Sequence, residues 1–277
     1  MGKEIDKYLL HIRRAALLGV NRLATKCADE KLDEEELDVI ASEISSALNY
    51  AKWVNSVAYA NRKLIQENKT RNIISLGRDC LGRTLPSKLG LIFNKKQGRQ
   101  RLPFDLATHP IEAVLHLLRT DFKDYFEADE YSFDARGLPT IKKHNIVFNH
   151  EDMTKIQEDN FEYLVQANTK RVEDFLSNVA QGPPLFLFHA AKWEVTHCVE
   201  LSEYLLEKFI DSRICIVMEI TPDAQEMAKR FEGKVELISK TYRQGYRWHR
   251  PKCYIGTPGR QIEHEIEEGL STAMCLS

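Results

Sequence analysis

The strongest constraint on the fold is the regular alternation of short apolar segments with longer amphipathic ones in the C-terminal half of the chain. Apolar runs cover residues 185–188, 214–218 and 235–238, and helical patterns cover 195–209, 223–231 and 260–270. Strands separated by helices of about ten residues or more are joined by crossover connections, which produce parallel pairing. The pattern therefore predicts an α/β fold with a mainly parallel sheet flanked by helices in a Rossmann-like three-layer arrangement.

Two apolar segments earlier in the chain are expected to add strands to this sheet. They cover residues 72–77 and 145–148, and helices are predicted over 111–126 and 154–180. Cys253 to Ile255 is a further candidate strand.

Apolar residues at helical spacing predict that residues 3–68 are helical throughout. We therefore divide the chain into an N-terminal helical extension, residues 1–70, and an α/β domain, residues 71–277, which is expected to carry the active site. The extension is interpreted as a packing or oligomerisation element, through which the chain would form a homo-oligomer.

Composition excludes several classes of protein. The 277 residues carry a net charge of −2, which gives no electrostatic reason to bind nucleic acid or an anionic membrane. No apolar run approaches the ~18 residues that span a bilayer, and the N-terminus lacks the features of a secretory signal. The six cysteines are scattered without metal-ligand spacing. We expect a cytoplasmic protein without disulfides.

The strand ends indicate where a site should lie. In an open parallel sheet, the loops that leave the carboxyl ends of the strands converge on one edge, and ligands bind there. Those loops cover residues 75–80, 149–152, 189–192 and 219–221, and each contains a side chain able to do acid–base, nucleophilic or ligand chemistry.

Cys80 is the sharpest single candidate among these residues. It follows Gly77, stands two residues from Arg78 and precedes a probable helix start. A helix N-terminus and a nearby cation both lower the pKa of a thiol, so Cys80 is predicted to be a reactive nucleophile. The alternative interpretation is a buried structural cysteine.

His150 is the candidate base. It could accept the thiol proton if an acid, Asp105 or Asp152, orients its ring. The alternative interpretation is a capping cluster in which Asp152 begins the following helix.

Other polar groups are candidates for substrate binding. The turn of Ser75, Gly77 and Arg78 is suited to hold a phosphate or an oxyanion, and His189 with Lys192 is suited to hold an anion. The basic run 95–101 is either a solvated loop or a lid for an anionic substrate. The aromatic segment 242–249 either stacks on a sugar or base or covers the core.

Several short motifs resemble those of a bacterial family of unknown function that is labelled papain-like cysteine peptidase. The matching segments are ISLGRDC at 74–80, which ends at Cys80, LPFD ending at Asp105, DF at 121–122 and FNHED at 148–152. The resemblance covers roughly residues 71–190, and Glu151 separates the histidine and aspartate that are adjacent in the family pattern. It implies that Cys80 is a nucleophile and His150 its base, with Asp105 or Asp152 as the orienting acid.

These observations together predict a cysteine-dependent hydrolase or acyl transferase whose substrate is unknown and is anionic or contains a sugar. One alternative is a transferase that acts on a nucleotide-sugar or surface-polysaccharide precursor, and another is a non-catalytic binding module. A metal site formed by His150, Asp152, His189 and Glu219 is conceivable, but their spacing does not require it. The sequence therefore predicts neither a metal nor a cofactor.

Overall fold

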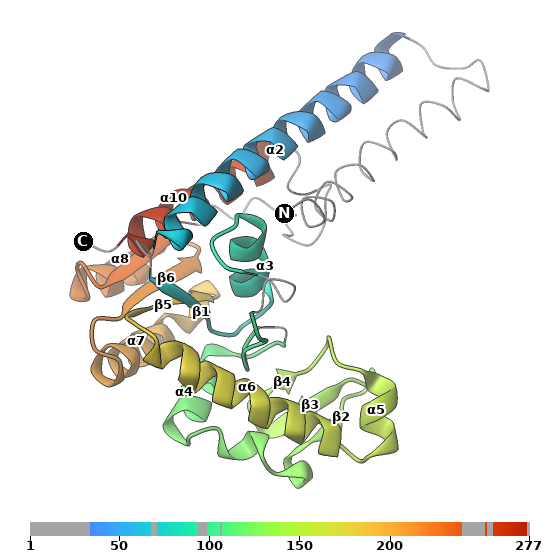
Figure 1. The fold of residues 1–277 in the computed structure, drawn as a ribbon, viewed down its shortest axis with the longest axis vertical. Helices are drawn as coiled ribbons and strands as arrows, with labels where there is room; N and C mark the ends of the chain where they lie inside the picture. The colour runs from blue at the N-terminus through green and yellow to red at the C-terminus, as the bar shows by residue number, and fades with distance from the viewer. Residues whose placement is uncertain are drawn as a thin grey trace, which may run out of the picture.

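A four-stranded parallel sheet lies at the centre of the computed structural model, which describes residues 34–67, 71–93, 99–105, 107–239, 253 and 257–275 (Figure 1). The strands are β1 Asn72–Ser75, β5 Pro184–His189, β6 Arg213–Met218 and β7 Val235–Ser239, paired in the order β1-β5-β6-β7. Every residue of β5 is buried, as is typical of a sheet covered on both faces. The predicted parallel α/β architecture is confirmed.

Helices cover both faces of this sheet, because alternate residues of each strand point to opposite sides. Leu185 and Leu187 belong to one apolar cluster, whereas Phe186 and Phe188 belong to the other. The first cluster includes side chains of α2 Glu34–Gln66, α3 Leu81–Lys88 and α10 Thr257–Met274. The second includes side chains of α4 Ile111–Arg119, α6 Glu162–Ala180, α7 Val195–Lys208 and α8 Pro222–Arg230.

The described part of the N-terminal extension is one continuous helix, α2. Its C-terminal half joins the core, where the Tyr50 hydroxyl donates to Glu263 of α10 at 2.5 Å. Asn61 donates to the carbonyl oxygen of Leu89, just after α3, at 3.0 Å. The other end of α2 projects away from the sheet (Figure 1). Residues 1–33 lie outside the described residues, and self-association through the extension stays a prediction.

The strand expected over 145–148 does not belong to the parallel sheet. It is the two-residue strand β4 Ile146–Val147 of a separate antiparallel sheet with β2 Ser132–Phe133 and β3 Pro139–Ile141. Only the short turn η4 Lys142–His144 and Asn145 separate β3 from β4. So short a connection permits antiparallel pairing alone, since a parallel pair needs a crossover of a dozen residues or more. The apolar pattern revealed the strand but not its partner.

Two helices are shorter than the sequence pattern predicts. The helix expected over 111–126 ends with α4, and Phe122 follows with a left-handed φ of 61°. The helix expected over 154–180 divides into α5 Met153–Glu158 and α6 at Phe161, whose φ is 72°. A left-handed residue cannot continue a right-handed helix. The remaining short turns are η2 Lys123–Tyr125, η3 Ala128–Glu130 and η5 Lys192–Glu194.

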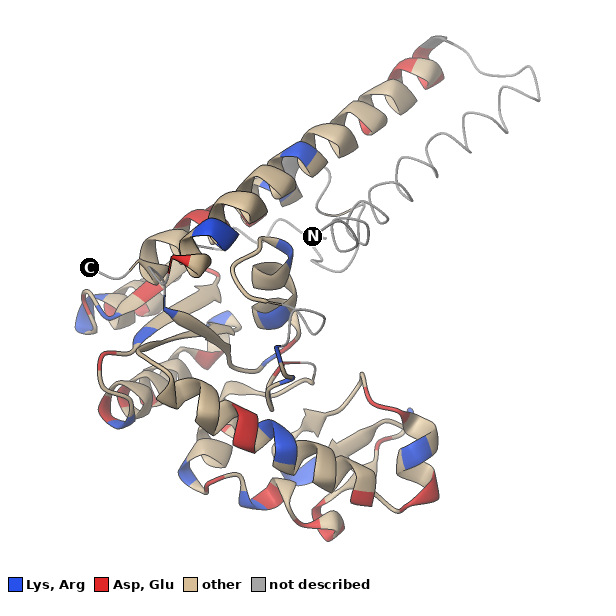
Figure 2. Ribbon diagram, viewed as in Figure 1, with Lys and Arg blue, Asp and Glu red and all other residues tan. Residues whose placement is uncertain are grey.

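Two surface properties bear on the expectations from composition. None of the helices in the described segments combines the length and apolar character needed to cross a bilayer. Figure 2 shows basic and acidic positions interspersed along α6 and the loops around it.

Of the candidate strand at 253–255, the structure describes only Cys253, which is helical.

The contact between α2 and the turn after α3 can be tested at Gly90. Its φ is +71°, and a Cβ there would lie 2.6 Å from the carbonyl oxygen of Ala58 in α2. Gly137 is a matched control, because its φ is +75° and no atom lies within 4 Å of an added Cβ. We expect Gly137→Ala to lower the free energy of unfolding by about 1 kcal/mol. Gly90→Ala should cost about 1–3 kcal/mol more, because α2 must move.

Urea unfolding of the full chain measures both losses. Equal losses for the two variants would contradict the close packing of α2 against this turn.

Candidate functional site

The turn that carries Cys80 connects β1 to α3 and is packed against the start of α4. Gly77 has a φ of +33°, and a Cβ there would lie 2.5 Å from Val114 and 2.9 Å from the Cβ of His109. The N–H of Arg78 donates to the carbonyl oxygen of His109 at 2.6 Å. Cys80 then occupies the N-cap position of α3. Only glycine at position 77 lets the strand exit approach α4 this closely.

His150 reaches Cys80 from the small antiparallel sheet. It lies in the turn between β4 and α5, and its Nε2 is 3.1 Å from the Sγ of Cys80. Cys80 is half-buried and His150 is exposed, so the pair is accessible from solvent. The expectation that these two residues lie within hydrogen-bonding distance is confirmed. The two side chains come from different sheets and not from neighbouring exits of one sheet.

The electrostatic environment of Cys80 is opposite to the one predicted. Burial, followed by the charge of Asp79, raises the pKa of the thiol to about 11. Asp105 also raises it, whereas the backbone N–H of Cys80 and the charge of Arg101 lower it. The neighbouring Arg78, which was expected to lower the pKa, pairs instead with Glu194. The prediction of a lowered thiol pKa is therefore wrong.

Neither predicted acid orients His150. Asp105 is fully buried, accepts from the N–H of Leu102 at 2.9 Å and lies 3.6 Å from the Nε of Arg83. Burial raises the pKa of Asp105, although the nearby arginines lower it. Asp152 caps α5 by accepting from the N–H of Lys155 at 3.4 Å. Within the described residues, neither carboxylate hydrogen-bonds to His150, which agrees with the capping interpretation of Asp152.

A histidine–aspartate pair that the sequence did not predict lies beside Cys80. His189 is the last residue of β5, is 3% exposed, and its Nδ1 lies 2.8 Å from a carboxylate oxygen of Asp79. The other oxygen of Asp79 accepts from the N–H of Leu81 at 2.9 Å. Lys192 lies instead 3.4 Å from Glu219 on the surface. His189 and Lys192 therefore do not form the predicted anion site.

A buried carboxylate holds the turn that carries His150. Glu151 is 2% exposed in its side chain, and its two oxygens accept from Arg101 and Arg171, each at 2.9 Å. Arg171 lies on α6 and also donates to Asn168 at 2.8 Å. The residue that separates His150 from Asp152 in the sequence thus joins the turn to α6 and to the 99–105 segment. Its only sequence signal was its place inside the FNHED motif.

The predicted phosphate cradle is not formed by side chains. Ser75 is fully buried, and its Oγ would lie 2.7 Å from a Cβ at Gly82 of α3. Ser75 therefore cannot contact a substrate, and Arg78 is engaged by Glu194 and lies 5.4 Å from the ring centroid of Trp193. Within the described residues, no backbone acceptor is bonded to the N–H groups of Asp79 and Cys80. These two N–H groups are therefore the candidates for oxyanion donors in the Gly77–Cys80 turn.

Two further predicted elements lie partly or wholly outside the described residues. In the basic run 95–101, Arg99 donates to the carbonyl oxygen of Ile73 at 2.8 Å, and Arg101 bonds Glu151. The described end of this run is thus attached to the domain and is not a free lid. The aromatic segment 242–249 lies outside the described residues.

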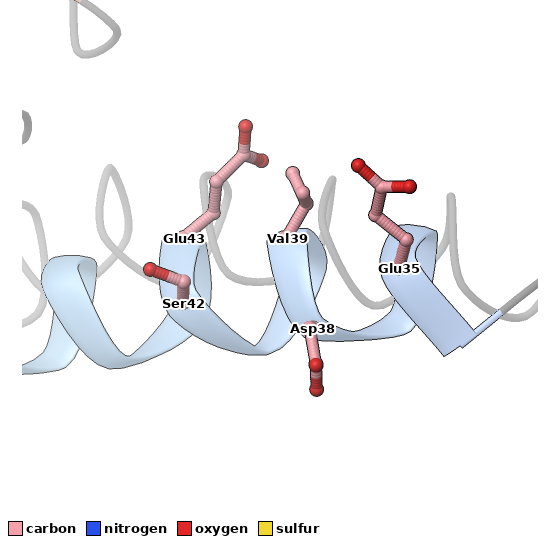
Figure 3. A pocket seen from close by; sticks show the side chains of 5 residues that line it. All are labelled: Glu35, Asp38, Val39, Ser42 and Glu43. Carbon is pink, nitrogen blue, oxygen red and sulfur yellow. The ribbon is translucent and has the colours of Figure 1, made fainter.

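A surface hollow lies elsewhere, on the first turns of α2 (Figure 3). It is lined by Glu35, Asp38, Val39, Ser42 and Glu43. All five side chains come from one helix, at the end of α2 that projects away from the sheet. This hollow contains no part of the Cys80 site.

Comparison with known proteins gives no relative: no family model, no curated protein and no solved structure matches this chain.

The raised thiol pKa predicts how Cys80 reacts with iodoacetamide. Alkylation of Cys80 should be slow near neutral pH and accelerate as pH rises toward 11, because only the thiolate reacts. Asp79→Asn should move the midpoint to lower pH, since it removes the nearest negative charge. Peptide mass spectrometry of a pH series measures both, with the exposed Cys275 as an internal standard. A midpoint below about 8.5, the value of a free thiol, would contradict this environment.

The two ion pairs of Glu151 predict that this residue contributes strongly to the stability of the fold. Glu151→Gln should lower the free energy of unfolding by about 3 kcal/mol, because the buried charge of Arg171 loses the carboxylate that neutralises it. Glu226→Gln on α8 is the control, since this exposed carboxylate lies 3.6 Å from an exposed Lys229 and should cost less than about 0.5 kcal/mol. Denaturant unfolding compares the two. Similarly small losses of stability in the two variants would mean that Glu151 does not hold the His150 turn in place.

Proposed function

We propose that this chain is a cysteine-dependent hydrolase or acyl transferase in which Cys80 is the nucleophile and His150 its general base. The single observation that carries the proposal is the 3.1 Å separation between the thiol sulfur and Nε2 at a solvent-accessible position. The resemblance of the surrounding motifs to the family labelled papain-like cysteine peptidase supports the same pair.

The raised pKa of Cys80 determines the mode of activation in this proposal. The thiol is protonated at neutral pH, so a preformed thiolate does not start the reaction. His150 instead accepts the proton through Nε2 while the sulfur attacks the acyl carbon. A carbon–sulfur bond forms, and the electron pair of the carbonyl bond moves onto its oxygen.

The rest of the reaction follows from the same groups. The N–H groups of Asp79 and Cys80 donate to the oxyanion. When the intermediate collapses, the leaving group departs with the proton held by His150, and a thioester on Cys80 remains. Water then releases the acid in a hydrolase, whereas a second nucleophile takes the acyl group in a transferase.

The buried groups around the pair act as positioning residues. Glu151 fixes the turn that carries His150, and the Asp79–His189 pair fixes the residue before Cys80. Their proposed role is to hold the geometry of the two reacting side chains, through the ion pairs that they form with each other and with the arginines. A transferase that binds a phosphate on Ser75 receives less support, because that side chain is fully buried.

Acyl transfer to Cys80 provides the test. Full-length protein is incubated with activated acyl esters and thioesters, and intact and peptide mass spectrometry locate the acyl adduct. We expect an adduct on Cys80 that Cys80→Ser abolishes. His150→Gln should lower its rate of formation by about 10²–10⁴-fold, because an amide cannot accept the proton.

Cys275→Ala is the matched control and should leave the rate unchanged, since this exposed cysteine lies just after α10. Two results would contradict the proposal: equal acylation rates in wild type and His150→Gln, or no adduct on Cys80 with any acyl donor. The second result would favour a non-catalytic binding module.

A further inference from the structure

Three side chains converge on one point between α4 and the small sheet. His116 lies in the last turn of α4, Asp124 in η2 and His144 at the end of η4. The Nε2 atoms of both histidines lie 2.8 Å from the same oxygen, Oδ2 of Asp124. The three atoms all lie within 4.8 Å of one another. The cluster shares no residue with the Cys80 site.

The local backbone explains why residues distant in sequence meet here. Left-handed conformations at Asp121 and Phe122 reverse the chain after α4, and the N–H of Phe122 donates to the carbonyl oxygen of Leu117 at 2.7 Å. This reversal folds η2 back alongside the last turn of α4. Asn145, with a φ of 53°, ends η4 directly after His144. The three side chains are thus held by the end of a helix and by two short turns.

The imidazole rings are arranged side by side. Their centroids are 4.1 Å apart with an interplanar angle of 34°. The Nε2 atom of each ring faces Asp124. Exposure of the side chains is 8% for Asp124, 17% for His144 and 39% for His116. The cluster is therefore shielded on the carboxylate side and open to solvent at His116, where a water molecule or another ligand can enter.

The charge of the cluster suits a cation. Both histidines lie against one oxygen of the Asp124 carboxylate, Oδ2, at 2.8 Å each. Lys143 bonds the other oxygen, Oδ1, at 2.9 Å and Glu130 at 2.7 Å. Oδ2 therefore faces only the two histidines among these partners. Together Asp124, Glu130 and Lys143 carry one net negative charge.

We infer that His116, Asp124 and His144 form a binding site for a zinc ion. Two imidazole nitrogens and one carboxylate oxygen are a donor set that zinc accepts, with a fourth position left for water. Calcium and magnesium are disfavoured, because they prefer oxygen ligands throughout. Bonds of about 2.0–2.1 Å in a tetrahedron place ligand atoms about 3.3 Å apart, so the 2.8 Å contacts must widen by about half an ångström.

Zinc would reinforce the contacts that already join three segments of the chain through Asp124. It binds the end of α4 to η2 and to the hairpin that ends in β4. The start of α4 contacts the Cys80 turn, and the turn after β4 carries His150.

Zinc titration of the full-length protein tests this site. The protein is stripped with a chelator, and zinc binding is followed by competition with a chromophoric chelator and by elemental analysis. We expect one zinc ion per chain and a concentration-dependent rise in melting temperature. His116→Gln with His144→Gln should weaken binding by on the order of a hundredfold or more, and Asp124→Asn should weaken it without removing the hydrogen-bonding atoms.

Two controls separate this site from other ligands. His197→Gln removes a partly exposed histidine of α7, and Cys80→Ser removes the thiol beside His150; both should leave the affinity for zinc unchanged. In the cobalt-substituted protein, a sulfur-to-metal charge-transfer band should be missing.

The inference is overturned if the wild type retains no zinc at micromolar free ion, which would leave the cluster as a hydrogen-bond network only. It is also overturned if Cys80→Ser abolishes binding while the double histidine variant, folded as judged by circular dichroism, retains it.

Discussion

The position of His150 depends on one buried carboxylate. Glu151 accepts from Arg101 and Arg171 with both oxygens, and it does so from within the turn that precedes α5. This interaction attaches the small antiparallel sheet to α6 and to the segment that leads into Asp105. Without it, the histidine would stand on an exposed turn whose backbone has few other constraints. The ion pairs therefore carry the geometry on which the proposed chemistry rests.

Cys80 is placed by packing, whereas His150 is placed by charge. Gly77 allows the β1 exit to press against α4, and α3 begins directly after the cysteine. The same burial that fixes the thiol raises its pKa, and Asp79 adds to the effect. A protonated thiol beside an accessible imidazole favours proton transfer during attack over a stored ion pair. The Cys80 thiol is thus held firmly in place, but its raised pKa makes it less reactive at neutral pH.

The neighbouring charges show why proximity in sequence is a poor guide to electrostatics. Arg78 stands two residues from Cys80 but turns toward Glu194, which also accepts from the N–H groups of Ile111 and Ala191. The cation that does affect the thiol is Arg101, more than twenty residues away in the chain. Long side chains reach partners several ångströms from their own backbone, so the fold and not the spacing decides which charges meet.

The parallel α/β core could be predicted from the order of residues alone, because an apolar run of four to six residues between amphipathic helices has few other ways to bury both of its faces. It also predicted that Cys80 and His150 lie in one site, and the structure places the two side chains 3.1 Å apart. Three contacts emerged only from the folded chain: β4 pairs with β3, Asp79 faces His189, and Glu151 lies between two arginines. Those contacts join segments up to 110 residues apart, and no local pattern records which distant polar groups will be buried together.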